Sequence, residues 1–356
     1  MKLWTLTTAS PRSAAGRAAI AERAGWHGIG VTDSQNLSGD AWVALTAMAG
    51  ATTHIELGTS VTNPITRHPA VTAAAAQSVA AIAGDRVVIG IGRGDSALAH
   101  IGRAPAPVEV LERYVRALTT YLRGGSVEFA DLGFGEATAP DVATLELADT
   151  PAASRLAWRR DDDPQVTVEV AATGPKVIAA AARAADRVVF ALGADERRLA
   201  WGIETARSAR AAAGLDPDAL ELGAYVNVVA HHDLDVARGL VSGSLTTFAR
   251  FAVLHGGVAG PVDDAQREVL ERIHDTYDMR QHTRADSVQA QSLTPEFVDS
   301  YAIVGPPDVC RARLEQLARL GLQKVIVIGA SPGSDIEQAR RAAALVETEV
   351  LPAFTD

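Results

Sequence analysis

Short runs of β-branched and other apolar residues alternate with longer, alanine-rich segments along most of this chain. Each run is almost continuously apolar and stops at Thr, Ser, Asp or Gly. Near-continuous apolar strands that alternate with helices predict a parallel sheet covered on both faces. We therefore predict eight strands, at residues 2–8, 27–33, 55–61, 86–92, 166–172, 187–193, 220–230 and 324–330.

The segments between these strands carry the signals of helix ends. Pro11 suits the first turn of a helix, and Gly25 suits its end. Further helices are predicted at 39–52, 69–83, 106–125, 175–185 and 195–214, and a last one from Ser334. In the segment 106–125 one helix face gathers the apolar residues Val108, Leu111, Val115, Leu118 and Leu122.

Two stretches break this rhythm. Residues 126–163 are predicted to run over the surface, and residues 233–321 are long, irregular and mostly helical. Eight strands and eight helices in strict alternation fit a (β/α)8 TIM barrel of the α/β class. We expect one domain over residues 1–356, with insertions near 126–163 and 245–300. A doubly wound sheet is the alternative, although it normally has fewer units and a clearer division into halves.

Composition narrows the class of protein. Of 356 residues, 47% are hydrophobic and 21% charged, which is typical of a globular chain. The net charge of −10 argues against a general affinity for nucleic acid or an anionic membrane. The one cysteine, Cys310, excludes an internal disulfide and fits a reducing compartment. With no signal-peptide core and no long apolar span, we expect a cytoplasmic enzyme acting on a small molecule.

In a TIM barrel the chemistry lies just beyond the carboxyl ends of the strands. Those ends are rich here in small and polar residues. No His, Cys, Asp or Glu cluster has the spacing of metal ligands, and no Gly-x-Ser-x-Gly motif is present. We expect no metal, and we expect the chemistry to be supplied by an organic cofactor.

The stretch GIGRGDSA follows the fourth strand. Gly90, Gly92 and Gly94 resemble a dinucleotide fingerprint, but Asp95 stands where the third glycine of that motif should let helix and strand pack. The motif also usually opens the first strand–helix unit, so we reject this interpretation. An adhesion role for Arg-Gly-Asp would need an exposed loop on a secreted protein, and nothing here indicates secretion.

Two other strand ends carry candidate chemistry. In AATGPK, Thr173, Gly174 and Lys176 place backbone N–H groups and a cation at a helix start, which favours an anion, although an ordinary turn would look the same. In TNPITRHP, Pro64 and Pro69 enclose a polar loop, and the polar cluster at this strand end includes Asn63 and His68, although the loop could simply be a rigid connection. The other single candidates have structural alternatives: Asp33, which could cap a helix; Trp4, on the site floor or in the core; and His231 and His232, of which at most one faces inward and either could be a solvated surface residue.

The segments VTNPITRHPAV, GIGRGDSA, AATGPKVIAAAA and YAIVGPPD, in this order at these strand ends, resemble the bacterial luciferase-like superfamily. They are most similar to its coenzyme F420-dependent oxidoreductases, in the style of methylenetetrahydromethanopterin reductase. The similarity spans nearly the whole chain and is weakest at 126–163. It implies a (β/α)8 barrel with insertions, usually a homodimer, that holds a flavin or deazaflavin at the strand mouths.

The resemblance also assigns residues. It implies a cis peptide bond at Ser60–Val61 behind the ring, and ring contacts from Asp33 and Asn63. By the same resemblance, Arg93 and Gly94 lie against the cofactor, and Asp95 matches the proton acceptor of sugar-phosphate dehydrogenases. The segment that grips the phosphate of the side chain comprises Thr173, Gly174, Lys176 and Val177.

One departure from the family pattern argues against a glucose-6-phosphate dehydrogenase. Those enzymes have a histidine after the aspartate of the second strand, whereas this chain has Ser34, which is not a comparable proton donor near neutral pH. The lysines that bind sugar phosphate also have no counterpart, because there is no lysine between Lys176 and Lys324.

We therefore expect an oxidoreductase that moves a hydride between reduced coenzyme F420 and a small carbonyl, C=C or C=N compound. The proton would be handled at Asp95, Ser34 or His68. The alternatives are a two-component monooxygenase that uses FMN and a non-catalytic flavin or deazaflavin binder. Substrate choice is expected to lie in 126–163 and 245–294, where possible anion-binding or merely solvated residues are Arg250, His255, Arg280 and His282.

Overall fold

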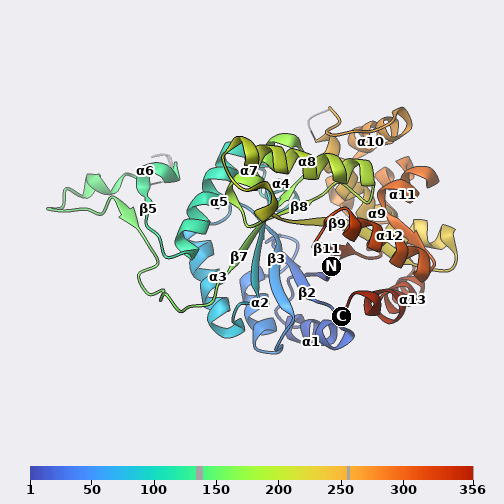
Figure 1. Ribbon diagram of the computed structural model, residues 1–356, viewed down its shortest axis with the longest axis horizontal. Coiled ribbons are helices and arrows are strands. Elements are labelled where there is room, and N and C mark those ends of the chain that lie inside the picture. The colour runs from blue at the N-terminus through green and yellow to red at the C-terminus, as the bar shows by residue number, and fades with distance from the viewer. Residues whose placement is uncertain (134–138, 255–256, 356) are drawn as a thin grey trace.

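The computed structural model describes residues 1–133, 139–254 and 257–355 (Figure 1). Eight parallel strands form a closed barrel, because each pairs with its neighbour and the last, β11, pairs with β1. The barrel strands are β1 (Lys2–Thr8), β2 (Gly28–Thr32), β3 (Glu56–Thr62), β4 (Val87–Ile91), β7 (Thr167–Ala172), β8 (Arg187–Phe190), β9 (Glu221–Ala230) and β11 (Lys324–Ile328). The predicted (β/α)8 barrel is confirmed, and an open doubly wound sheet is excluded.

Helices surround the strands, and most begin where the sequence signals place them (Figure 1). Outside residues 126–163, the described α-helices between the strands up to β9 are α1 (Ala14–Ala24), α2 (Ala41–Ala49), α3 (Pro69–Ala83), α4 (Ser96–Ala99), α5 (Val108–Leu122), α7 (Pro175–Ala184) and α8 (Glu196–Ala212). Gly25 ends α1 with a φ of 93°, a left-handed conformation that favours glycine. Pro11 lies before α1 rather than inside it, because residues 10–13 form a turn in which Ser10 O accepts from Ser13 N.

The chain between β9 and β11 is longer than any other connection between barrel strands. It holds α9 (Leu234–Arg250), α10 (Asp264–Thr276), α11 (Pro295–Tyr301) and α12 (Pro307–Arg319), which agrees with the mostly helical prediction. It also contains a short strand, β10 (Ile303–Gly305), that the sequence did not predict and that pairs with the end of β9. The last helix, α13 (Ile336–Leu345), starts after Asp335, slightly later than predicted.

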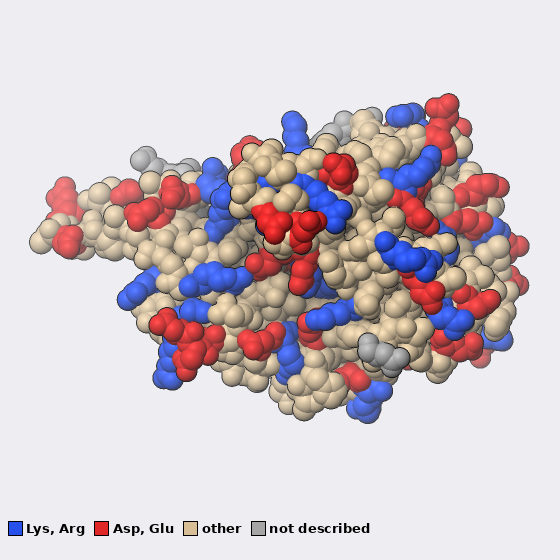
Figure 2. Space-filling view, in the orientation of Figure 1, with Lys and Arg blue, Asp and Glu red and all other residues tan. Residues whose placement is uncertain are grey.

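The described part of residues 126–163 stands clear of the barrel, at the left of Figure 1. There β5 (Val127–Glu128) pairs antiparallel with β6 (Ala153–Ser154), and α6 (Phe129–Leu132) follows β5. The surface excursion predicted for this stretch agrees with its position, whereas the assignment of the whole chain to one domain stays a prediction. Figure 2 shows acidic and basic side chains interspersed over the face that it presents. Among the described residues, no helix is long and apolar enough to span a bilayer.

The barrel interior combines apolar packing with a buried ion cluster. Trp4 is fully buried there, so it packs in the core, and its ring lies 3.2 Å from Lys324 Nζ. Lys324 Nζ donates to both carboxylate oxygens of Glu169, at 2.9 and 2.8 Å, and Arg187 Nη1 donates to the same carboxylate at 2.7 Å. Burial raises the pKa of Glu169, but these two cations outweigh it and hold the pKa below its usual value.

Candidate active site

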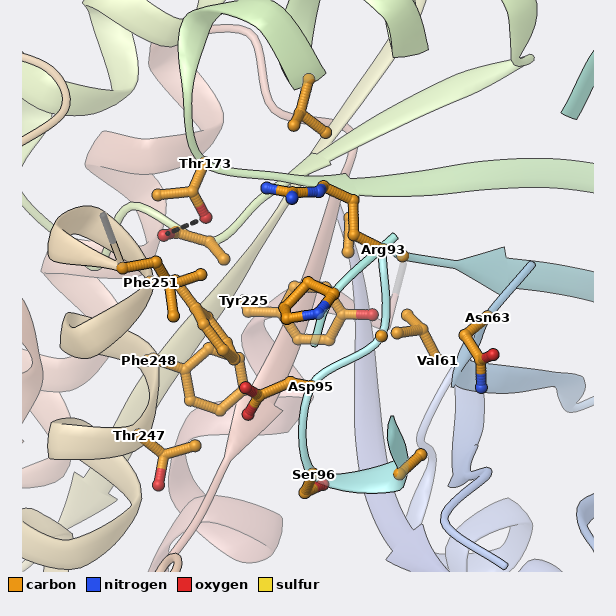
Figure 3. Close-up of a pocket in the computed structure, with 18 of the residues that line it drawn as sticks. Val61, Asn63, Arg93, Asp95, Ser96, Thr173, Tyr225, Thr247, Phe248 and Phe251 are labelled. Atoms are coloured by element: carbon orange, nitrogen blue, oxygen red, sulfur yellow. Dashed lines mark hydrogen bonds between the residues drawn. The ribbon is translucent and has the colours of Figure 1, made fainter. Parts of the chain in front are cut away.

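A cavity of about 340 Å³ opens at the carboxyl ends of the barrel strands (Figure 3). Its lining comes from the loops that follow β2, β3, β4 and β7, from β9, and from the chain after α9 begins. The structure brings together in this lining the predicted site residues Asp33, Ser34, Ser60, Val61, Asn63, Arg93, Gly94, Asp95, Thr173, Gly174 and Val177. Because these residues come from segments far apart in the sequence but line one cavity, they can belong to a single site.

Two of the residues predicted to handle the proton or contact the cofactor, His68 and Lys176, lie outside the cavity lining. His68 precedes α3, and its Nδ1 accepts a hydrogen bond from Ala70 N at 3.1 Å, so its ring caps the helix. Burial lowers the pKa of His68. Lys176 is exposed in the first turn of α7. The proton role of His68 and the cofactor contact of Lys176 therefore stay predictions without support from the cavity.

The peptide bond between Ser60 and Val61 is cis, which confirms the conformation that the family resemblance implied. Ser60 Oγ lies 2.9 Å from the hydroxyl of Tyr225 on β9. A Cβ at Gly30 would lie only 2.7 Å from the Cβ of Ser60, so the absence of a side chain on β2 allows this close packing. Val61, the second residue of the cis peptide, lines the cavity (Figure 3).

Polar groups surround the end of β3. Asp33 is buried, and its Oδ2 accepts a hydrogen bond from Thr62 Oγ1 at 2.7 Å, with Arg67 Nη1 3.9 Å away. Asn63 Oδ1 accepts from the backbone N–H groups of residues 65 and 66, which fixes the side chain. Asn63 Nδ2 is buried and has no hydrogen-bond partner among the described residues. A buried donor of this kind is costly unless a ligand accepts its hydrogen bond.

The glycine-rich stretch forms the loop between β4 and α4. Gly94 has a φ of 86°, and a Cβ there would lie 2.5 Å from Leu98 Cδ1, so glycine is required. Arg93 Nε donates to the carbonyl oxygen of Ala106 at 2.5 Å, and burial lowers the pKa of Arg93. Its guanidinium extends toward Thr173 at the end of β7 (Figure 3).

Asp95, on the same loop, is bound by a residue that sequence analysis did not connect with it. Arg250 at the end of α9 donates from Nη2 to Asp95 Oδ1. The Arg250 guanidinium lies 4.3 Å from the centroid of the Tyr277 ring, within range of a cation–π contact. Nothing in the sequence pattern relates positions 95 and 250, because they meet only when the barrel closes.

The turn between β7 and α7 lines another part of the cavity. Thr173 Oγ1 donates to the carbonyl oxygen of Ala191 at 3.3 Å. Gly174 is the residue before the helix, and no atom lies within 4 Å of where its Cβ would be. Backbone N–H groups at an open helix start favour an anionic group.

The remaining wall comes from α9 and from the chain after it. Thr247, Phe248, Phe251, His282 and Thr283 belong to this lining. Except for His282, sequence analysis did not select these residues, and Tyr225 was hidden inside a predicted strand. Of the candidate anion-binding residues of this region, His255 lies outside the described residues, and exposed Arg280 pairs with Asp278 at 2.9 Å.

Among the described residues, no group of three or more His, Cys, Asp or Glu side chains is arranged to hold a metal ion. The cavity lining itself can accommodate a flat ring against Val61, a hydrogen-bond acceptor at Asn63 and an anion at Gly174.

Comparisons with known proteins agree with this geometry. The family model of luciferase-like monooxygenases matches residues 2–324. A 5,10-methylenetetrahydromethanopterin reductase of Methanolobus tindarius is 26% identical over 90% of this chain and 91% of its own. An F420-dependent glucose-6-phosphate dehydrogenase of Beutenbergia cavernae is 30% identical over 65% of this chain and 67% of its own. The structure of the coenzyme F420-dependent tetrahydromethanopterin reductase from Methanopyrus kandleri superposes with a TM-score of 0.73 at 22% identity, covering 99% of both chains.

Proposed function

The chain belongs to the family of luciferase-like monooxygenases, and on that premise we propose that it is an F420-dependent oxidoreductase. It transfers a hydride between coenzyme F420 and a small organic compound with a C=O, C=C or C=N bond. A relative and a solved structure whose names specify F420 support the cofactor. The observation that carries the proposal is the buried, unpartnered Nδ2 of Asn63 in the cavity lining, beside the Ser60–Val61 bond.

The residues present fit a deazaflavin with a phosphate-bearing side chain. Val61 offers an apolar surface to a flat ring, and Asn63 Nδ2 can donate to a ring oxygen or nitrogen. Thr173, the open space at Gly174 and the first N–H groups of α7 can hold the phosphate, with Arg93 as the nearby cation. The bound cofactor supplies the hydride; the chain positions it and excludes water.

The proton transfer that accompanies hydride transfer must be carried out by side chains of the protein. Arg250 occupies Oδ1 of Asp95, which leaves Oδ2 without a hydrogen-bond partner among the described residues. We therefore retain Asp95 as the candidate proton acceptor. Ser34 Oγ lies 3.5 Å from Ser96 Oγ at the cavity edge, where a hydroxyl can orient a substrate or a water molecule.

Fluorescence quenching with F420 and, separately, with FMN tests the cofactor. We expect F420 to bind in the micromolar range or tighter and FMN to bind more weakly. Binding of FMN without F420 would replace this proposal by a two-component monooxygenase, which the name of the family favours. Turnover of a carbonyl, C=C or C=N compound by the F420-loaded protein separates an enzyme from a non-catalytic binder.

We further propose that the protein is a cytoplasmic homodimer that associates through α2 and α3. Val43 on α2 and Val71 on α3 are more than half exposed, at 55% and 54%, although both helices are strongly apolar. A second copy of the chain would cover them. Light scattering of the wild type and of the variant Val43→Glu/Val71→Glu tests this, with a dimer expected only for the wild type.

A further inference from the structure

The cavity wall opposite Val61 is built by the chain between β9 and β11 and has a composition of its own. Phe248 stacks on Tyr225 at a centroid distance of 5.5 Å and meets Phe251 edge-on at 5.8 Å. Thr247 and His282 add one hydroxyl and one imidazole to the same lining. Apolar rings with a few polar groups suit a small, largely apolar molecule.

The cation nearest to this wall is already bound. Arg250 lies outside the cavity lining, pairs with Asp95 and stacks on Tyr277. Its Nη2 donates to Asp95, and its Nε is buried without a hydrogen-bond partner among the described residues. The described residues that this wall contributes to the lining include no Lys or Arg. The nearest charge is the Asp95 carboxylate on the loop after β4, which is already paired with Arg250, so this wall offers an anionic substrate no compensating cation.

His282 is the neutral donor at this wall. Its Nδ1 lies 2.7 Å from the hydroxyl of Tyr277, and that hydroxyl lies 3.1 Å from Thr247 Oγ1. Burial, aided by Arg250 and His100 and opposed by Asp95, lowers the pKa of His282 to about 4, so the ring is neutral at pH 7. We assign the Tyr277 hydroxyl as the donor to Nδ1, so that the neutral imidazole carries its proton on Nε2. Nε2 has no partner among the described residues, and the ring lines the cavity.

We propose that this wall is a subsite for an uncharged carbonyl or imine compound with small apolar substituents. His282 Nε2 donates a hydrogen bond to the oxygen or nitrogen of the reacting double bond, and Phe248 and Phe251 hold the substituents. Tyr277 acts as a positioning residue that sets the imidazole tautomer. This inference rests on the proposed hydride transfer and specifies its substrate class.

The matched probes are isobutyramide and isobutyrate, which have the same shape but differ in charge, and neither of which is expected to accept a hydride. Each is titrated into protein with ¹⁵N-labelled histidine, both free and loaded with F420, and the Nε2 signal of His282 is followed. We expect the amide to bind saturably and to shift that signal. We expect isobutyrate to bind at least about tenfold more weakly than the amide.

Three variants and one control test the donor. His282→Leu is expected to weaken amide binding about tenfold, because one hydrogen bond is lost. His282→Gln restores part of the affinity, since its amide nitrogen can donate. Tyr277→Phe leaves the ring in place but allows both tautomers, which changes the Nε2 signal. His232→Leu removes an exposed histidine outside the lining and is expected to change nothing.

Equal or tighter binding of isobutyrate, absence of saturable amide binding, or unchanged amide affinity in His282→Leu would each overturn the inference. Failure of F420 to bind in the quenching titration would instead overturn the proposed function. The titrations of the free protein then decide the subsite independently.

Discussion

Arg250 and Asp95, 155 residues apart, form an ion pair at the edge of the cavity. Asp95 belongs to the glycine-rich loop after β4, and Arg250 ends α9. Both side chains are mostly buried, with exposed fractions of 20% and 10%. The pair thus fastens the strand-mouth loop to the long connection between β9 and β11, and it fixes the direction of a carboxylate in the cavity lining.

We predict that this pair couples the two segments energetically. Arg250→Gln leaves Asp95 beside the cavity without its cation and should lower the free energy of unfolding by about 2 kcal/mol. Asp95→Asn combined with Arg250→Gln should recover part of that loss, with a coupling energy of about 1–3 kcal/mol. Urea unfolding of the four proteins of this cycle measures it, and additive effects would contradict the coupling.

Asn63→Asp tests the unpartnered donor. The new carboxylate can still accept the two backbone hydrogen bonds that Asn63 Oδ1 accepts, but the Nδ2 donor is gone. We expect F420 affinity to fall about tenfold or more, because one buried hydrogen bond is lost. Fluorescence quenching measures the affinity, and exposed Asn36→Asp is the matched control. An unchanged dissociation constant would show that Asn63 does not contact the cofactor.

Gly30→Ala tests the support behind the Ser60–Val61 bond. The added methyl would lie 2.7 Å from Ser60 Cβ, so β3 must shift away from its position. Overpacking of this kind costs about 1–3 kcal/mol, and we expect weaker F420 binding as well. Gly16→Ala on α1 is the control, because nothing lies within 4 Å of that Cβ. That variant should bind F420 normally and gain about 0.5–1 kcal/mol of stability.

The ion cluster inside the barrel is predicted to be essential for stability. Lys324→Met leaves Glu169 with Arg187 as its remaining cation and should destabilise the protein by about 3–5 kcal/mol. Lys2→Met breaks a pair with Glu56 at the surface, where Lys2 is 49% exposed, and should cost less than about 1 kcal/mol. Similar losses in urea unfolding for the two variants would refute the distinction.

His282 should make stability depend on pH. Its pKa near 4 in the folded protein lies below the value of about 6.5 expected for the unfolded chain, so the unfolded state binds more protons between these pH values. The free energy of unfolding should therefore fall as pH decreases from 6.5 to 4. His282→Gln should reduce this fall by about 2 kcal/mol. His27 and His68, whose pKa values are also lowered, keep a smaller pH dependence in the variant.

The barrel itself was predictable because each strand–helix unit carries its own local signals. Gly25 and Asp195 mark helix ends by backbone and side-chain chemistry that acts within a few residues. The short strand β10 escaped prediction because its pairing with the end of β9 is a long-range effect. The family resemblance correctly implied the cis bond at Ser60–Val61, which no local pattern would have revealed.

The cavity residues also divide into those that local sequence patterns place and those that depend on long-range packing. Those at strand mouths, such as Asn63 and Thr173, follow strands that the sequence marks clearly. Arg250, Tyr277 and His282 lie on a connection whose course depends on packing, so their joint position could not be read from spacing. The sequence also could not show that Asp95 is paired, since a carboxylate has no local signature of a distant cation.

The connection that supplies Phe248, Phe251 and His282 adds no strand to the closed barrel, because β10 pairs only with the end of β9. The residues proposed to hold the cofactor lie on the barrel loops instead. Mutation and insertion in this connection can therefore change the molecule that reacts without disturbing the register of the eight strands. Under these proposals, cofactor use and substrate preference lie on separate stretches of the gene, so that selection could alter one while conserving the other.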